Sequence, residues 1–347
     1  MKSSIFTIIF TVLLIATIPL ISIAIGKTND NVQTAASITT SPPSNAAENN
    51  NEISTDSNSS LSQSNSFKIY DRAVNKVITV NDYDFCCGAL ATETESDIPS
   101  EALKAQAIVI HTYYSYLRNE SRKNNEDYDF ECNSQIWEIY ANKNDIKEKW
   151  GDTFNESYGI IEKNVKEVID TFVLYNNKPA MTKYFEISSG TTESYQEIYG
   201  DEIPYLINVP SPFDTTANNY KTTVSLTYDE FNKAIKKKYN DYKYDKDYQK
   251  NISDFEKNDY GAVLSLKIGN KSIKGKELCN IANLRSNTFE LECKDDKYIF
   301  TVYGYGENIG LSQYGACKMA EQGSSYVDIL QYYFPNTTIV NNYIPEI

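Results

Sequence analysis

The stretch ETESDIPSEALKAQAIVIHTY, residues 93–113, decides the fold of the central part of this chain. Ser100 is placed to cap a helix, and Glu101 falls in the first turn, where exposed amide groups favour negative charge. Apolar residues then recur at steps of four and three, which is typical of one buried helical stripe. The stripe consists of Leu103, Ala107, Ile110, Tyr114 and Leu117. The sequence therefore predicts a long helix that begins next to Ser100.

Acidic residues crowd the segment ahead of that helix. Glu93, Glu95 and Asp97 alternate with other residues, so in an extended segment they share one face. Their mutual repulsion would then raise a carboxyl pKa. A fixed helix beside such a cluster can hold one acid in a defined geometry. A solvated acidic turn before an ordinary core helix is the alternative interpretation.

The first 66 residues predict a membrane anchor followed by a tether. Residues 5–25 are uncharged and mostly apolar, and a membrane-spanning helix needs about 20 such residues. A good small-x-small cleavage site is missing, so residues 1–26 are expected to stay as an N-terminal anchor. Residues 27–66 are rich in Ser, Asn and Thr and poor in large apolar residues, which predicts a flexible linker.

The remaining residues, 67–347, suit one large domain or two lobes. Strand-like runs such as 262–269 mix with helical runs without a regular βαβ rhythm, which favours an α+β fold. Local signals predict a hairpin turn at residues 176–177 and a capping box formed by Thr227 and Glu230.

The charge of the chain excludes one class of partner. The net charge is −14, from 47 acidic and 33 basic residues. Nucleic acid is recognised through basic patches, so it is not an expected partner. Carbohydrate remains compatible with this charge.

Six cysteines are present, and the sequence favours buried free thiols for most of them. Cys86 and Cys87 would face opposite sides of a strand, and Cys279 and Cys293 flank a segment that could form a hairpin. No CxxC spacing occurs, which gives no support to an autonomous zinc site.

Four motifs resemble those of one protein family. They are EALKAQA with the following Thr-Tyr pair (101–113), SSGTTESYQEIYGDEIPYLINVPSPFD (188–214), NLRSNTFEL (283–291) and GYGENIGLSQYGACKMAEQGSSYVDILQYYFPNTTI (304–339). In this order, over roughly residues 67 to 345, they resemble the signature of the stage II sporulation protein D family (SpoIID/LytB).

This resemblance implies a cell-wall enzyme outside the cytoplasm. A family member resembles a lytic transglycosylase, which cuts the glycan bond after N-acetylmuramic acid and leaves a 1,6-anhydro end. The sugar's own 6-hydroxyl attacks, so one carboxyl group can act first as acid and then as base. Alignment of EALKAQA places the family's catalytic glutamate at Glu93, with Glu95 as the alternative. No cofactor is implied.

The other motifs are expected to bind the glycan. Short hydroxyls and a tight glycine turn in the middle motif suit sugar hydroxyl and N-acetyl groups, although an ordinary polar loop has the same composition. Arg285 is expected to hold a carboxylate, with a surface salt bridge as an equal alternative. The expected binding residues are Ser188, Ser189, Gly190, Thr192, Glu193, Ser194, Arg285, Ser312, Gln313 and Tyr314.

The chain departs from the family pattern at several positions. Thr94-Glu95 replaces a Met-Pro pair, Glu307 replaces a histidine, and His111 replaces an arginine; for His111 we expect a packing role. Some relatives bind zinc through a Cys-x4-His-Cys segment. In the matching run from Cys132, Ile136 and Trp137 occupy the ligand positions, so no metal is predicted.

The leading hypothesis is a single-pass membrane protein whose extracytoplasmic domain degrades peptidoglycan during forespore engulfment and prefers peptide-stripped glycan. The resemblance implies two partners beyond the glycan strands: an amidase that removes stem peptides and a membrane protein that recruits both. The alternative is a non-catalytic, glycan-binding activator of an N-acetylmuramoyl-L-alanine amidase.

Overall fold

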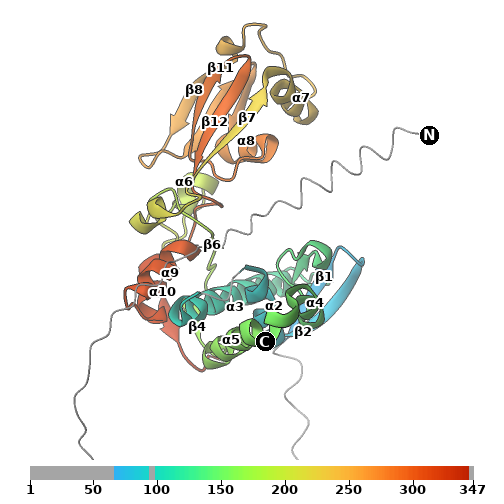
Figure 1. The fold of residues 1–347 in the computed structure, drawn as a ribbon, viewed down its shortest axis with the longest axis vertical. Coiled ribbons are helices and arrows are strands. Elements are labelled where there is room, and N and C mark those ends of the chain that lie inside the picture. The colour runs from blue at the N-terminus through green and yellow to red at the C-terminus, as the bar shows by residue number, and fades with distance from the viewer. Residues whose placement is uncertain (1–65, 94–97, 344–347) are drawn as a thin grey trace, which may run out of the picture. The chain divides into compact units, whose positions relative to one another are not determined.

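The computed structural model describes residues 66–93 and 98–343, which all belong to one compact unit of the chain, residues 58–347. Helices and small sheets are mixed along this unit, which confirms the predicted α+β class (Figure 1). The helices are α2 (Asp82–Glu93), α3 (Ser100–Lys123), α4 (Lys143–Trp150), α5 (Phe154–Val168), α6 (Tyr195–Tyr199), α7 (Tyr228–Lys238), α8 (Gly275–Ala282), α9 (Gln313–Glu321) and α10 (Tyr326–Tyr333). Single turns of 3₁₀ helix occur at η1 (Ser134–Ile136), η2 (Gly151–Thr153), η3 (Pro212–Thr216) and η4 (Tyr248–Asn251).

The strands form five small sheets among the described residues. Their orders are β2-β1-β3, β14-β4-β5, β13-β6, β11-β12-β7 and β10-β9-β8. The strands are β1 (Ser66–Asp71), β2 (Lys76–Asn81), β3 (Phe130–Cys132), β4 (Phe172–Tyr175), β5 (Lys178–Pro179), β6 (Tyr184–Phe185), β7 (Lys221–Thr227), β8 (Ile252–Lys257), β9 (Val263–Ile268), β10 (Lys271–Lys274), β11 (Phe289–Lys294), β12 (Lys297–Tyr303), β13 (Leu311–Ser312) and β14 (Thr338–Val340).

Two separate groups of buried apolar side chains form the cores of this unit. The larger core surrounds α3, which packs against α2, α5, α9 and α10. The smaller core lies among β7, β9, β11 and β12 and the helices α7 and α8. Figure 1 shows these strands with α7 and α8 beside them.

Helix α3 forms where the apolar stripe predicts it. Leu103, Ala107, Ile110 and Tyr114 are buried, and Leu117 is half-buried. The predicted cap is wrong, because Pro99 takes the N-cap position and Ser100 is the first helical residue. The Ser100 hydroxyl instead donates a hydrogen bond to the side chain of Asn164 on α5, so it joins two helices.

Two other local predictions are confirmed. Asn176 and Asn177 have φ angles of 52° and 60°, as a tight turn between the antiparallel strands β4 and β5 requires. The capping box of Thr227 and Glu230 starts α7.

The strand prediction for Cys86 and Cys87 is wrong, because both lie inside α2 and are buried. The hairpin prediction for Cys279 and Cys293 is also wrong, since Cys279 lies in α8 and Cys293 in β11. Helical packing against α3 decided the first case, because two adjacent cysteines show no helical or strand periodicity of their own. All six cysteines are free.

The predicted anchor and linker lie outside the described residues, apart from Ser66. Within residues 66–93 and 98–343, no helix has the length and apolar character that a bilayer crossing requires.

Candidate active site

Two very short strands bring the middle and C-terminal motifs together. β6 pairs in parallel with β13, with Tyr184 opposite Leu311 and Phe185 opposite Ser312. The amide of Tyr314 also donates to the carbonyl oxygen of Glu186 at 3.0 Å. The pairing therefore sets Gln313, the first residue of α9, beside the segment that carries Tyr184 and Glu186.

Glycines make this close approach possible. Gly306 and Gly310 have φ angles of 112° and 88°, which L side chains rarely adopt. A Cβ at Gly310 would lie 2.0 Å from the carbonyl oxygen of Lys183, and one at Gly306 would lie 2.6 Å from the Cβ of Phe185. The glycine spacing of the C-terminal motif is thus a requirement of the β6–β13 contact.

Glu93 lies at the meeting point of these elements. It is the last residue of α2, so it is helical and does not belong to an extended acidic segment. The Nε2 atom of Gln313 donates to Oε2 of Glu93 at 3.5 Å, a long contact that joins residues 220 positions apart. Glu95 and Asp97 lie outside the described residues.

The surroundings of Glu93 favour a protonated carboxyl. Burial by neighbouring protein atoms raises its pKa, and the charge of Glu186 adds to this rise, whereas Gln313 and Tyr184 favour the charged form. The side chain is nevertheless exposed to solvent, which limits the effect of burial. Glu93 is therefore an accessible carboxyl group with a raised pKa, which suits a general acid.

Glu186 is a second carboxyl at this site that sequence reasoning missed. Burial raises its pKa, while Asn219 and the charge of Arg285 oppose that rise. Nδ2 of Asn219 donates to Oε1 of Glu186 at 3.3 Å. Glu186 directly follows β6 and precedes the middle motif by two residues, so it lay just outside the segment that the motif covers.

Arg285 makes no ion pair within 4 Å among the described residues. Its Nη2 atom donates to the carbonyl oxygens of Asn219 at 2.6 Å and Gly304 at 3.4 Å, and its guanidinium group stacks on the ring of Tyr305. The surface salt bridge considered from the sequence is therefore not formed here. Arg285 holds the Asn219 segment in place and directs positive charge toward Glu186.

The middle-motif residues divide into a buried group and an accessible group. Ser188, Thr192 and Glu193 are buried, while Ser189, Gly190 and Ser194 are half-buried. The buried side chains hold the loop: the Ser188 hydroxyl accepts from the Gly190 amide at 3.0 Å, and the Thr192 hydroxyl donates to the carbonyl oxygen of Ile207 at 2.9 Å.

Several contacts join the segment of residues 188–216 to the C-terminal motif. Nδ2 of Asn308 donates to the Ser189 hydroxyl at 2.8 Å. Ser312, which is fully buried, donates to Asp214 at 2.8 Å and caps α9. The Tyr314 hydroxyl lies 3.3 Å from that of Thr216. Ser312 thus has a structural contact, whereas Gln313 faces the candidate acid.

Glu307, which replaces the family's histidine, is held as a carboxylate. It pairs with Lys183 at 2.8 Å and with Lys276, and it accepts a hydrogen bond from the Tyr199 hydroxyl at 3.0 Å. Burial acts to raise its pKa, but the two lysines outweigh burial and lower the pKa to about 2. A carboxylate held charged by two lysines is a poor proton donor near neutral pH, so Glu307 does not suit the role of general acid.

His111 lies in the larger core. Its Nε2 atom is 3.0 Å from Oδ2 of Asp82, and Arg118 pairs with the same carboxylate at 3.0 Å. The ring packs against Phe172 with centroids 4.5 Å apart. In the part of the chain that the structure describes, no group of three or more His, Cys, Asp or Glu side chains is arranged to hold a metal ion.

Comparison with known proteins gives matches to sporulation proteins. Residues 70–198 match the family model SpoIID, described as "Stage II sporulation protein". The chain is 29% identical to stage II sporulation protein D of Bacillus subtilis (strain 168) over 276 residues, which cover 79% of this chain and 78% of that protein. Identity to stage II sporulation protein D of Bacillus amyloliquefaciens is 28% over the same length and the same shares.

A third relative matches over a shorter region. The amidase enhancer of Bacillus subtilis (strain 168) is 39% identical over 90 residues, which cover 25% of this chain and 13% of that protein. The family model and the two longer matches are all named for sporulation. The chain thus resembles the stage II sporulation protein D (SpoIID) family over most of its length.

Proposed function

We propose that this protein is a lytic transglycosylase that cleaves the bond between N-acetylmuramic acid and N-acetylglucosamine in peptidoglycan, with Glu93 as its single general acid and base. The observation that carries the proposal is the contact between Gln313 and Glu93, which brings two family motifs to one accessible carboxyl. The raised pKa of Glu93 and the lowered pKa of Glu307 support the choice of acid.

In the proposed reaction the protonated Glu93 donates its proton to the glycosidic oxygen, and the bond to the muramic acid C1 atom breaks. The 6-hydroxyl of the same sugar attacks C1, and the Glu93 carboxylate accepts the hydroxyl proton. The products are a 1,6-anhydro end and a free N-acetylglucosamine end. Tyr184 and Gln313 would stabilise Glu93 in the charged state between the two steps.

The setting of this activity is also part of the proposal. Residues 1–26 would anchor the protein in the cell membrane, and the linker of residues 27–66 would let the extracytoplasmic domain reach the wall. Peptide-stripped glycan strands would be the substrate, supplied by a sporulation amidase, with a membrane protein that recruits both enzymes during engulfment.

Product analysis tests the reaction. Full-length protein is incubated with peptide-free glycan strands, and the fragments are measured by mass spectrometry. We expect anhydro-muramic ends from the wild type, none from Glu93→Gln, and unchanged formation from Glu95→Gln, which serves as the matched control. If Glu95→Gln loses activity and Glu93→Gln retains it, Glu95 is the acid and the assignment to Glu93 is contradicted.

The neighbouring Glu186 makes hydrolysis a specific competing outcome, because hydrolytic glycosidases use two carboxyl groups. Fragments heavier by one water, with reducing muramic ends, would indicate hydrolysis. If these ends disappear in Glu186→Gln, the protein is a hydrolase and not a transglycosylase.

A second candidate function is the activation of an amidase, which the 90-residue match to the amidase enhancer favours. A wild type that makes no new glycan ends yet accelerates the release of stem peptides by an added amidase would support this function over the enzyme.

A further inference from the structure

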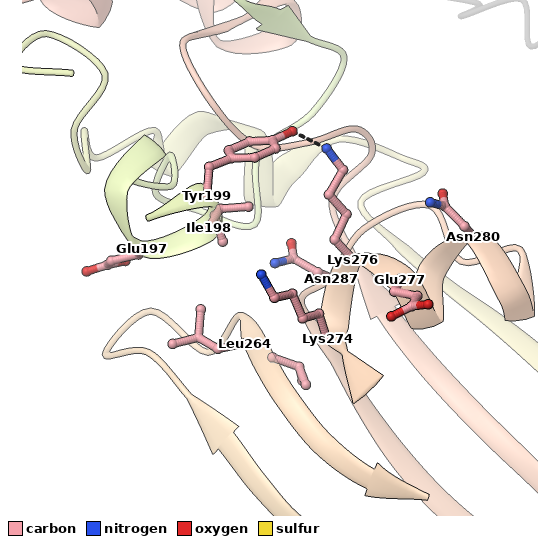
Figure 2. Close-up of a pocket in the computed structure, with 10 residues that line it drawn as sticks. Glu197, Ile198, Tyr199, Leu264, Lys274, Lys276, Glu277, Asn280 and Asn287 are labelled. Atoms are coloured by element: carbon pink, nitrogen blue, oxygen red, sulfur yellow. Dashed lines mark hydrogen bonds between the residues drawn. The ribbon is translucent and has the colours of Figure 1, made fainter. Parts of the chain in front are cut away.

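A cavity of about 290 Å³ lies between α6 and the segment from β9 to α8 (Figure 2). A second cavity of about 190 Å³ continues it, because Ile198, Lys276, Asn280 and Asn287 line both. The second cavity reaches Arg285, so the hollow leads toward the candidate active site. Arg285 holds the carbonyl oxygen of Asn219, whose side chain in turn donates to Glu186.

Two polar groups in this hollow have no partner within the described residues. Asn287 is only 8% exposed, and no hydrogen bond engages its carboxamide, although its backbone carbonyl oxygen accepts from Val263 at 2.8 Å. Lys274 makes no ion pair or hydrogen bond through its ammonium group. Figure 2 shows this ammonium group and the Asn287 carboxamide pointing toward the same space. The carboxamide and the ammonium group are therefore both available to a ligand in this hollow.

Lys274 supplies the available positive charge of the cavity. Lys276 is already paired with Glu307 and the Tyr199 hydroxyl. Of the two lining acids, Glu197 accepts from Asn258 at 2.9 Å and Glu277 lies 3.9 Å from Lys238. Their carboxylates point away from the Lys274 ammonium in Figure 2. An anionic group entering the cavity would therefore meet Lys274 first.

The cavity wall also contains apolar side chains, namely those of Ile198, Val263 and Leu264. An apolar wall beside a carboxamide suits an N-acetyl group, whose methyl packs and whose amide hydrogen-bonds. A free ammonium group beside them suits a carboxylate. These features together describe an acetylated sugar that bears a free carboxylate.

We propose that this cavity is a distal glycan subsite that binds a muramic acid residue through its free lactyl carboxylate, with Lys274 and Asn287 as the recognition residues. The inference rests on the proposed function and deepens it. A stem peptide converts the lactyl carboxylate into an amide, which removes the charge and adds bulk. Lys274 would thus select strands from which the peptides have been removed.

Binding measurements with the full-length Glu93→Gln protein, which holds the strand without cutting it, test the subsite. Calorimetry compares a peptide-free oligomer of alternating N-acetylglucosamine and N-acetylmuramic acid with a chitin oligomer of equal length, which has no carboxylate. Adding Lys274→Gln should weaken binding of the muramic oligomer roughly tenfold, the loss expected for one charge-assisted hydrogen bond. Binding of the chitin oligomer should stay unchanged, and Lys274→Arg should restore most of the affinity.

The control is Lys294→Gln, which removes another exposed lysine without an ion pair, at the end of β11. Asn287→Ala should weaken binding of both oligomers, because both carry N-acetyl groups. If Lys274→Gln and the parent Glu93→Gln protein bind the muramic oligomer with equal affinity, the subsite is contradicted. It is also contradicted if Lys274→Gln weakens binding of both oligomers equally. Product analysis of the wild type separates the two proposals. If the wild type cleaves but Lys274→Gln does not change binding, only the subsite is contradicted. If binding depends on the carboxylate but the wild type does not cleave, only the proposed enzyme activity is contradicted.

Discussion

The carboxyl groups of Glu93 and Glu307 are tuned in opposite directions by their neighbours. Burial is the largest cause that raises the pKa of Glu93, and the charge of Glu186 adds to this rise. Glu307 sits between Lys183 and Lys276, so its pKa falls to about 2 despite burial. One fold thus holds one carboxyl group with a raised pKa and one with a lowered pKa within the same group of motifs.

Gln313→Ala should move the pH dependence of cleavage. The Gln313 hydrogen bond favours the charged form of Glu93, so its loss raises the pKa of Glu93 further. Because the reaction starts from protonated Glu93, the alkaline limb of the pH–rate profile should shift to higher pH. Lost positioning should also lower the maximal rate roughly tenfold. Gln322→Ala, at the exposed end of α9, is the control, and a shift to lower pH would contradict the assignment.

Glu193→Gln should make the protein's stability less dependent on pH. Glu193 is fully buried beside Asn258, and burial raises its pKa to about 7. Because the folded pKa is raised, the stabilising effect is complete below the ordinary carboxyl value and is lost as pH rises through 7. Between these limits the wild-type free energy of unfolding should fall by on the order of 3 kcal/mol.

Urea denaturation at several pH values measures this change. Glu193→Gln should remove most of the fall, whereas Glu197→Gln, at an exposed residue bonded to the same Asn258, should leave it intact. Parallel pH profiles for the wild type and Glu193→Gln would contradict the buried-acid account.

The short β6–β13 pair depends on Gly310, and Gly310→Ala tests that dependence. The substitution should destabilise the protein by about 3 kcal/mol or more and reduce cleavage, because the added Cβ would strike the carbonyl oxygen of Lys183. Gly323→Ala is a matched control: its φ of 92° is similar, but nothing lies within 4 Å of the added Cβ. It should cost only about 1 kcal/mol. If both variants lose the same free energy of unfolding in thermal or urea denaturation, the effect comes from backbone strain and not from the contact with Lys183.

Helices α2 and α3 are joined by a buried ion group, which Arg118→Met should disrupt. Arg118 is 1% exposed and pairs with Asp82, which also contacts His111. Burial acts to raise the pKa of Asp82, but His111 and Arg118 outweigh it and lower the pKa. Loss of Arg118 leaves a buried carboxylate with weaker compensation, so the free energy of unfolding should fall by about 3–5 kcal/mol.

Arg122→Met, one turn later on α3, is the control for this prediction. Its side chain is 39% exposed and lies 4.0 Å from Asp129, so its loss should cost no more than about 1 kcal/mol. The wild type should also lose stability as pH falls below the ordinary aspartate range, because the lowered pKa of Asp82 favours folding only while the group is charged. Equal unfolding free energies for both variants would show that the ion group contributes little.

Elements with strong local signals were predicted correctly from the sequence. The stripe of α3, the asparagine turn between β4 and β5 and the capping box of α7 each depend on residues close together in the chain. The start of α3 was misplaced because a tertiary contact of Ser100 with Asn164 replaced the cap. Helix α2 was missed because its two adjacent cysteines and mostly buried residues carry no clear periodicity.

The candidate site was only partly predictable for the same reason. Motif resemblance pointed to Glu93 and Gln313, but neither their contact nor the role of Glu186 could be derived from residues so far apart in sequence. Ser188 and Glu193 suit sugar binding by residue type, yet both are buried and Ser188 supports the loop instead. Burial and through-space charge depend on the complete fold, which short motifs do not specify.

At the level of the whole chain, two cores contribute to one proposed reaction. The larger core positions Glu93 and Gln313, while the segment after the smaller core's α8 supplies Arg285 and the distal cavity. A strand bound across both would gain affinity far from the bond that is cut. Under the two proposals, binding of the strand would then depend on residues such as Lys274 that line the distal cavity.

A crystal structure of Glu93→Gln with a peptide-free glycan strand tests the central claim most directly. The account predicts the side chain at position 93 within about 3 Å of a glycosidic oxygen that follows a muramic acid residue. The 6-hydroxyl of that residue should face its own C1 atom. A strand that binds with every glycosidic oxygen beyond hydrogen-bonding reach of position 93 would contradict the claim.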